Sequence, residues 1–213
     1  MLPLTRLTFS LLALIAISQQ LLIHISASYN VLNFFSYFTN LSNLFAAVIL
    51  LLGVFLKSGG SHDLARYVST VNMAVVGLVF AVLLRNVDLG SLLPWVNFVL
   101  HYVMPVAIVL DWLVNPPAVK LKPRQVLLAL VFPMIYLLYV IIRGAYTGWY
   151  PYPFLNPAKV GGNGVVAAYS FALAATFIFF SWAFLAIGNR LSSAKPLQKH
   201  DIPAAHSDKV SDL

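Results

Sequence analysis

The chain has 213 residues, of which 61% are hydrophobic and only 9% are charged, and its net charge is +7. A soluble core of this size needs far more polar surface, so the composition excludes a soluble globular protein and indicates a helical integral membrane protein. The absence of cysteine excludes disulfides, thiolate metal sites and cysteine nucleophiles, and membrane topology explains the basic residues better than binding of nucleic acid does.

Six apolar segments are each close to the roughly 20 residues that a helix needs to cross the hydrocarbon of a bilayer. They lie at about 7–27, 34–56, 67–86, 95–115, 125–142 and 165–189, and their connections are too short for a soluble domain. The sequence therefore predicts an all-α, polytopic membrane protein, with a bundle of six transmembrane helices in residues 1–190. Residues 191–213 are polar and are predicted to form a disordered cytoplasmic tail.

The basic residues are distributed unequally between the two predicted sides of the membrane. Three of them, Arg85, Arg143 and Lys159, fall on the side without the termini. The side with both termini has ten, namely Arg6, Lys57, Arg66, Lys120, Lys122, Arg124, Arg190, Lys195, Lys199 and Lys209. Because short cytoplasmic loops carry an excess of Lys and Arg, this bias predicts that both termini are cytoplasmic.

One face of the second predicted span is polar in its outer half. Spacings of three and four residues place Ser36, Thr39, Asn40 and Asn43 on one stripe of a helix, and the segment is then aliphatic up to Gly53. Such side chains often hydrogen-bond to neighbouring membrane helices, with each contact contributing about 0.6 kcal/mol, and they also line functional cavities. The sequence leaves both interpretations open.

Ionisable side chains mark the outer parts of the third and fourth spans. Arg85 ends the third span, where it either pairs with Asp88 three residues later or attracts an anionic group of a substrate. His101 lies well inside the fourth span, four residues after Asn97 and on the same helical face. Lipid cannot hydrogen-bond an imidazole, so His101 is a candidate functional residue.

The fifth span and the loop after it are rich in aromatic residues. Tyr136, Tyr139 and Arg143 follow one helical face to the outer side, where a loop with several tyrosines and prolines runs on to Pro157. Each proline restricts the residue before it to extended backbone. The loop is therefore expected to form either a rigid cap over the polar face or an aromatic anchor at the membrane surface.

Three motifs resemble a known family. They are Tyr37-Phe38-Thr39-Asn40, then Leu100-His101 with Pro105, and finally Arg143-Gly144 through Gly148-Trp149-Tyr150-Pro151-Tyr152-Pro153-Phe154-Leu155. In this order they resemble the bacterial family of predicted six-transmembrane proteins, which is similar to the eukaryotic androgen-induced and androgen-dependent membrane proteins. The latter are threonine hydrolases of fatty acid esters of hydroxy fatty acids. The resemblance implies a lipid ester hydrolase of a bacterial inner membrane, with Thr39 as the nucleophile and His101 as the base.

The predicted topology places these two residues at one depth. Thr39 lies about five residues inside the second span and His101 about six inside the fourth, which is roughly 8 to 9 Å below the outer surface. A threonine hydroxyl is too weakly acidic to attack an ester unless a base lies within hydrogen-bond reach. Ser42, about one turn deeper, is the alternative nucleophile, because the polar residues around Thr39 depart from the pattern of the hydrolases.

No acidic residue lies at this depth to complete a triad, so other side chains are expected to support the pair. They are Asn97, Asn40 or Tyr136 to orient the imidazole, Asn43 or Asn97 to bind the oxyanion, and Arg85 or Arg143 to attract an acidic lipid group. No cofactor is predicted. No metal is predicted either, because a site usually needs three protein ligands and His24 and His101 are the only imidazoles on the outer side.

Two functions from different classes remain. The first is a lipid esterase whose partners are membrane lipids and an acyl-ester substrate. The second is a non-catalytic lipid-binding or transport protein in which the same polar face lines a cavity in the outer half of the membrane. A polar pathway through the inner half would favour transport, and there the sequence is nearly all aliphatic apart from Asn72.

Overall fold

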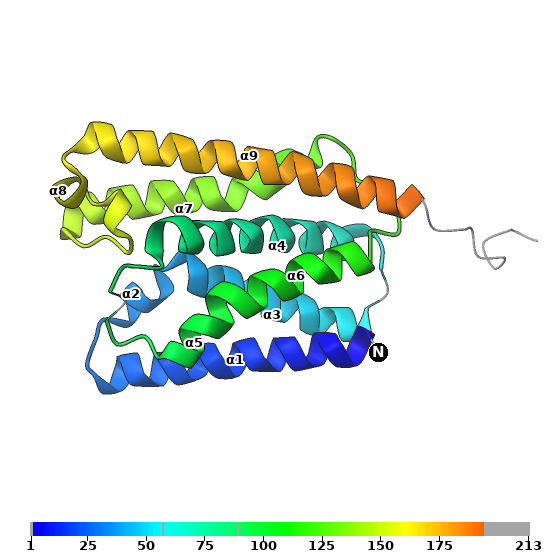
Figure 1. The fold of residues 1–213 in the computed structure, drawn as a ribbon, viewed down its shortest axis with the longest axis horizontal. Helices are drawn as coiled ribbons and strands as arrows, with labels where there is room; N and C mark the ends of the chain where they lie inside the picture. Colours follow the sequence, from blue (N-terminus) through cyan, green and yellow to red (C-terminus); the bar gives the residue numbers. More distant parts are fainter. Residues whose placement is uncertain (1, 57, 89, 194–213) are drawn as a thin grey trace, which may run out of the picture.

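The computed structural model describes residues 2–56, 58–88 and 90–193. Within these residues the fold is a bundle of helices without strands, and six helices are long and apolar enough to cross a membrane (Figure 1). The prediction of an all-α bundle with six spanning helices is confirmed. The spans are Leu2–Ser26, Phe38–Phe55, Gly60–Leu84, Pro94–Val114, Gln125–Thr147 and Asn163–Ser192. The predicted tail lies outside the described residues from position 194 on.

Some spans consist of more than one helical element, and short helices also occur in the connections. In chain order the helical elements are α1 (Leu2–Ser26), α2 (Val31–Phe35), α3 (Phe38–Phe55), α4 (Gly60–Val79), η1 (Phe80–Leu84), α5 (Pro94–Phe98), η2 (Val99–Val103), α6 (Met104–Val114), α7 (Gln125–Thr147), η3 (Pro153–Leu155), α8 (Pro157–Val160) and α9 (Asn163–Ser193). Both η1 and η2 are π-helices, and η3 is a 3₁₀-helix.

The helix α4 lies at the centre of the bundle (Figure 1). It packs against α3 and α6 and also against α7 and α9, whereas α1 packs mainly on α3. In its most apolar stretch 56% of the residues are buried, compared with 28% for α1, α7 and α9. Because α4 is surrounded by other helices, three of its side chains, Val75, Val76 and Val79, form one wall of an apolar cavity inside the bundle.

The second span is broken near its N-terminal end, although the sequence predicted a continuous helix over 34–56. Tyr37 has extended backbone, and α3 begins at Phe38. One hydroxyl compensates the break, since Tyr136 Oη donates to the Ser36 carbonyl at 2.7 Å and accepts the Phe38 N–H at 3.1 Å. Backbone groups freed inside a membrane need such partners, and this one comes from a distant part of the chain.

Wider, π-helical turns interrupt the third and fourth spans at η1 and η2. In each, the N–H that follows the segment donates to the carbonyl five residues earlier. Pro105 lies just after η2 and has no N–H, so the carbonyl of His101, four residues earlier, is left without its usual helical partner. Turns of this kind often occur at functional sites, and η2 carries His101.

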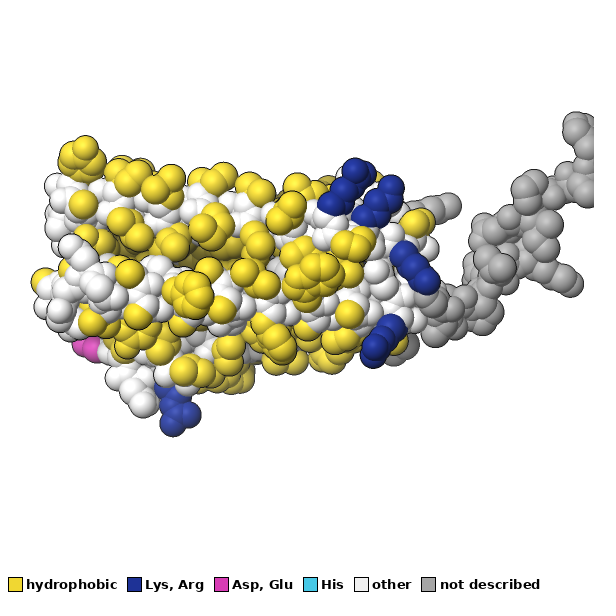
Figure 2. Space-filling model, turned by 90° about the horizontal axis from the view of Figure 1, so that it is seen from above, with side chains coloured by type: hydrophobic (Ala, Val, Ile, Leu, Met, Phe, Trp, Pro, Cys, Tyr) yellow, Lys and Arg dark blue, Asp and Glu magenta, His cyan; other side chains and the backbone are white. Residues whose placement is uncertain are grey.

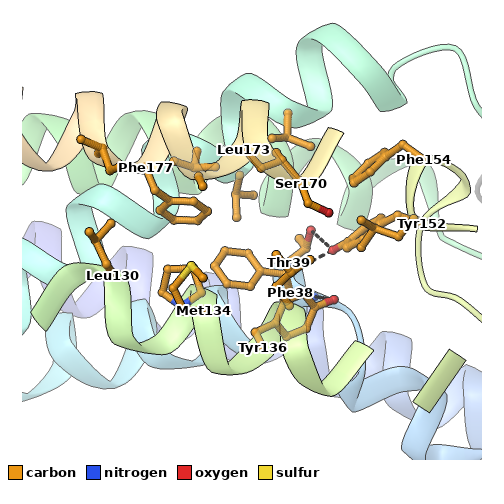
Figure 3. A pocket seen from close by; sticks show the side chains of 18 of the residues that line it. Phe38, Thr39, Leu130, Met134, Tyr136, Tyr152, Phe154, Ser170, Leu173 and Phe177 are labelled. Carbon is orange, nitrogen blue, oxygen red and sulfur yellow. Dashed lines mark hydrogen bonds between the residues drawn. The ribbon is translucent and has the colours of Figure 1, made fainter. Parts of the chain in front are cut away.

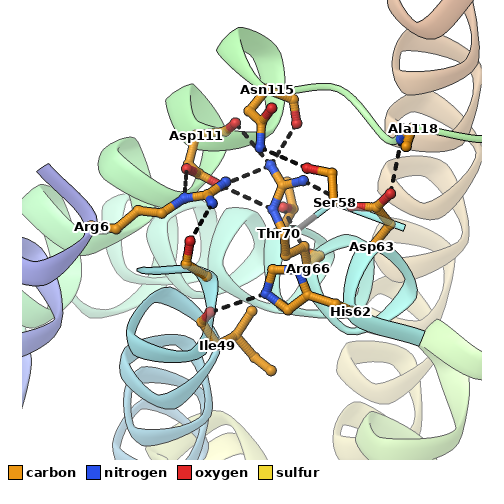
Figure 4. Close-up of polar contacts among 11 residues, drawn as sticks. Arg6, Ile49, Ser58, His62, Asp63, Arg66, Thr70, Asp111, Asn115 and Ala118 are labelled. Carbon is orange, nitrogen blue, oxygen red and sulfur yellow. Dashed lines mark hydrogen bonds and ion pairs between the residues drawn. The ribbon is translucent and has the colours of Figure 1, made fainter. Parts of the chain in front are cut away.

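A cluster of buried charges lies near the end of the bundle where α1 begins (Figure 4). The Asp111 carboxylate accepts from Arg6 Nε at 2.6 Å and from Arg66 Nη2 at 2.8 Å. Arg66 Nη1 also contacts Asp63 at 3.2 Å. The sequence indicated that the predicted inner half of the bundle is nearly all aliphatic, and this interpretation is wrong. Four charged side chains lie in this half, and their mutual ion pairs compensate for removing them from water.

The two arginines of this cluster bear on the predicted topology. Arg6 and Arg66 were assigned to solvent-facing loops, but both lie within spans and are buried. Removing these two from the ten basic residues leaves eight against three, a bias that still favours cytoplasmic termini. Leu2 and the end of α9 lie at the same end of the bundle (Figure 1), and Lys and Arg gather toward that end on the face seen in Figure 2. Which side of the membrane this end faces remains a prediction.

Candidate functional site

Thr39 lies in the first turn of α3, directly after the break at Tyr37. Its side chain is almost buried, with the residue 7% exposed. The Tyr152 hydroxyl accepts the Thr39 N–H at 3.2 Å and lies 3.4 Å from Thr39 Oγ1 (Figure 3). The first N–H groups of a helix have no partner within it, so Tyr152 satisfies one of them and at the same time contacts the candidate nucleophile.

His101 lies on η2 and is also 7% exposed. Its Nδ1 lies 3.2 Å from the Asn97 carbonyl, and its ring stacks on Phe80 of η1 at a centroid distance of 4.1 Å. A carbonyl only accepts hydrogen bonds, so Nδ1 carries the proton and Nε2 presents a lone pair. This tautomer is the one that a general base needs.

Thr39 and His101 line the same polar cavity, which has a volume of about 500 Å³. In the described structure no hydrogen bond joins the two side chains, so the proposed nucleophile–base contact remains a prediction. Catalytic hydrogen bonds are often long before substrate binds, so the absence of this one does not exclude the pair. The α3 and η2 segments are themselves linked, because Asn43 Nδ2 donates to the carbonyls of both Thr39 and Leu100, at 2.9 and 3.1 Å.

A second, apolar cavity meets the polar one at Thr39. It has a volume of about 100 Å³ and extends between α3, α4, α7 and α9 (Figure 3). Only Thr39, Leu84 and Tyr152 line both cavities. Thr39 therefore lies where an apolar space ends and a polar space begins.

The supporting residues predicted from the sequence fall into different places. Asn40 lines the polar cavity and donates to the Phe34 carbonyl at 2.8 Å. The Asn97 backbone carbonyl, rather than its side chain, orients the imidazole, and Asn97 Oδ1 is buried without a partner. Tyr136 hydrogen-bonds at the break before α3 and lines the apolar cavity, so it does not contact His101.

The two outer arginines line neither of these cavities. Arg143 Nη2 donates to Asn33 Oδ1 at 2.6 Å, and the guanidinium lies 4.7 Å from the centre of the Trp149 ring. Arg85 is exposed, and no ion pair joins it to Asp88, although both residues are described. Neither arginine therefore contacts the cavities, and Arg143 holds the aromatic loop through Trp149.

Ser42, the alternative nucleophile, is fully buried and lines neither cavity. Its hydroxyl has no hydrogen-bond partner. A nucleophile must meet its substrate, so this placement favours Thr39. Among the described residues, no three His, Cys, Asp or Glu side chains come together as metal ligands.

The aromatic loop supplies a functional candidate that the sequence analysis missed. Tyr152 is buried, stacks on Phe154 at 5.2 Å and contacts Tyr37 edge-on. Burial raises the pKa of Tyr152 above its usual value of 10.0, so the phenol stays protonated at neutral pH. The prolines on both sides of Tyr152 were a signal that the loop holds it in one conformation, but nothing local showed that it contacts Thr39.

Comparisons with known proteins agree with the fold. A family model described as FAR-17a/AIG1-like protein matches residues 5–187. The match covers all six spans except the first residues of the first span and the last residues of the sixth. Neither the search of curated proteins nor the search of solved structures gives a match.

Proposed function

The chain belongs to the FAR-17a/AIG1-like family, and on that premise we propose that this multi-pass membrane protein hydrolyses fatty acyl esters. Thr39 is the nucleophile and His101 is the general acid and base. The observation that carries the proposal is the place of Thr39 at the junction of an apolar and a polar cavity, with His101 on the wall of the polar one. The resemblance of the motifs around Thr39 and His101 to the threonine hydrolases supports the same residues.

The reaction follows from which atoms of the two side chains carry a proton and which can accept one. Thr39 Oγ1 attacks the ester carbonyl while its proton passes to His101 Nε2, directly or through one water. The tetrahedral intermediate collapses to an acyl–threonine ester, and the imidazolium returns the proton to the departing alkoxide. Water then attacks the acyl–threonine with His101 again accepting a proton, which releases the fatty acid and restores Thr39.

Tyr152 is the better placed donor to the developing oxyanion. Asn43 Nδ2, the donor expected from the sequence, already contacts two carbonyls. The Tyr152 oxygen accepts the Thr39 N–H, which leaves its own proton free to donate. Removing one such donor from an oxyanion site typically costs about 10²–10³-fold in turnover.

The proposal is tested with purified protein, a long-chain acyl ester and an esterase-directed fluorophosphonate. Thr39→Val keeps the shape but removes the hydroxyl, so it should abolish hydrolysis and labelling, whereas Thr39→Ser should retain part of both. His101→Ala should reduce turnover by about 10²–10⁴-fold with little effect on substrate binding. Thr176→Val is the matched control, because the Thr176 hydroxyl contacts only its own helix at Ala172. Labelling that survives Thr39→Val would exclude Thr39 as the nucleophile.

A second candidate function is binding or transport of lipid without catalysis. One observation favours it: both side-chain amide atoms of Asn72, near the middle of α4, are buried without a partner. Unpaired polar atoms at this depth often interact with water or with a ligand. If no ester is consumed and Thr39→Val has no effect, this function replaces the first.

The cellular setting follows from the charge bias and the resemblance. We expect a bacterial inner membrane, cytoplasmic termini, and a polar cavity that opens toward the outside. A reporter fused to the C-terminus that is active outside the cell would contradict this topology.

A further inference from the structure

We propose that the apolar cavity beside Thr39 is the binding site for one unbranched fatty acyl chain, which enters sideways from the bilayer between α7 and α9. The depth of this cavity, closed at Leu130, limits the length of the chain. The inference rests on the proposed function for the identity of the scissile bond, but binding of the chain can be tested without catalysis.

The lining of the cavity favours a hydrocarbon. Apart from Thr39, the hydroxyl-bearing residues that line it are Tyr136, Tyr152 and Ser170. Tyr136 Oη donates to the Ser36 carbonyl, Ser170 Oγ donates to the Val166 carbonyl at 2.8 Å, and Tyr152 lies against Thr39. Polar groups below Thr39 are therefore already hydrogen-bonded, and no charged side chain lines the cavity. A polar head group would find no partner there.

Residues on three of the spans give a consistent depth for the apolar cavity. The lining residues extend from Leu84 to Val75 on the third span, from Leu137 to Leu130 on α7 and from Ser170 to Ile178 on α9. At 1.5 Å per residue these segments are about 10 to 14 Å long. Thr39 and Tyr152 lie at the outer end of this space and Leu130 and Phe177 at the inner end (Figure 3).

The narrowness of the cavity selects the type of chain. Its volume of about 100 Å³ is one fifth of the polar cavity's 500 Å³, although it runs over several helical turns. A slot of this shape takes a single extended chain and excludes a sterol or two chains side by side. The polar cavity, which Asp88 and Lys159 also line, is left for the alcohol part of the ester.

The wall between α7 and α9 is open to lipid. Met134 on α7 and Ile178 on α9 both line the cavity, and they are 51% and 45% exposed on the side of the bundle. The face on which α9 lies is covered with hydrophobic side chains over most of its length (Figure 2). On the opposite wall Val76 of α4 is buried. A chain dissolved in the bilayer therefore reaches Thr39 without crossing water.

The first test uses decanoic acid with a diazirine at its methyl end, added to the protein in phosphatidylcholine vesicles, because an extended chain of ten carbons matches the depth of the cavity. Lipid-facing residues such as Phe179 will be labelled in any case, so the informative sites are the buried lining residues Val76 and Phe177. We expect mass spectrometry to find label on them. Ala174→Trp fills the side opening and should reduce this label at least tenfold, whereas Ala175→Trp, on the exposed face next to it, should not.

The second test measures chain-length preference with nitrophenyl esters of butyric and decanoic acid. Leu130→Trp shortens the cavity and should lower the decanoyl-to-butyryl ratio of kcat/KM by about tenfold or more, since one or two methylenes that no longer fit have effects of that size. Leu128 is exposed on another face of α7 and does not line the cavity, so Leu128→Trp should leave the ratio unchanged.

The outcomes separate this inference from the proposed function. Absence of label on Val76 and Phe177, or equal label in Ala174→Trp, would overturn the chain site even if esters are hydrolysed. Label on these residues without any hydrolysis would support the chain site and reject the esterase. An unchanged ester ratio in Leu130→Trp would reject the limit on chain length.

Discussion

At the scale of single residues, the Tyr152 hydroxyl is the group that contacts the candidate nucleophile. Tyr152→Phe removes this oxygen and keeps the ring packed on Phe154. We expect kcat to fall by about 10²-fold with little change in KM, because the donor acts on the transition state. The Thr39 N–H loses its partner, which should cost about 1–3 kcal/mol of stability. Tyr146→Phe is the control, because Tyr146 is 87% exposed, and loss of activity there would show a general effect of removing phenols.

The same hydroxyl makes a prediction about pH. Its pKa is raised above 10.0 by burial, so in the unfolded chain the tyrosine ionises at a lower pH than in the fold. The folded protein should lose stability as the pH rises above 10, and Tyr152→Phe should lose less over that interval. Unfolding of both proteins in detergent, followed between pH 8 and pH 11, measures the difference. An increase in the stability of the unaltered protein over that interval would contradict the buried, protonated phenol.

Single residues also show how much of the candidate site could be predicted from the sequence. Thr39 and His101 were placed at one depth from span boundaries alone, and the structure brings them to one cavity. Tyr152 was missed because it is 113 residues away from Thr39 and reaches it only through a loop that folds back over the bundle. The role of Asn97 was predicted for its side chain but is performed by its carbonyl, which every residue type carries.

At the scale of elements, the aromatic loop is held against α7 at Gly144. A Cβ atom there would lie 2.0 Å from Tyr150 Cε1, so the tyrosine ring occupies the space that any other residue would need. Gly144→Ala should preserve α7, since alanine favours helix, but it should displace the loop that carries Tyr152. We expect hydrolysis to fall about tenfold or more while helix content by circular dichroism is unchanged. Gly164→Ala is the matched control in α9, because its Cβ meets nothing within 4 Å. Equal activity of the two variants would show that the loop is only a membrane anchor.

The helices also differ in whether the local sequence is enough to predict their geometry. The six spans follow from hydrophobicity and length, which are properties of each segment. The break before α3 and the π-turn at η2 depend on partners elsewhere, namely the Tyr136 hydroxyl and the ring of Phe80. Pro105 gave a local hint of irregular hydrogen bonding in the fourth span, but the stacking of His101 on Phe80 of η1 could not be predicted from it.

At the scale of the whole molecule, the charge cluster joins α1, α4 and α6 (Figure 4). Its pairing could not be predicted, because Arg6 and Arg66 look like loop residues that flank apolar segments, and their shared partner Asp111 ends a different span. The guanidinium of Arg6 also needs Gly53, where a Cβ atom would lie 3.0 Å from Nη1. Because Gly53 lies on α3, the arrangement is a property of four helices together.

This cluster gives a prediction about global stability. Asp111→Asn removes the carboxylate that both arginines share and leaves two buried guanidinium groups without their main partner. Breaking a buried ion pair by removing one partner typically costs about 3–5 kcal/mol, so the variant should unfold at a clearly lower temperature in detergent. Asp88→Asn is the control, since Asp88 is exposed and its carboxylate accepts only the Gly90 N–H among the residues that the structure describes. In the variant that still folds, the chain-length preference should be unchanged, because Asp111 lies outside both cavities that meet at Thr39. Equal unfolding temperatures of the two variants would mean that water or lipid already compensates the arginines.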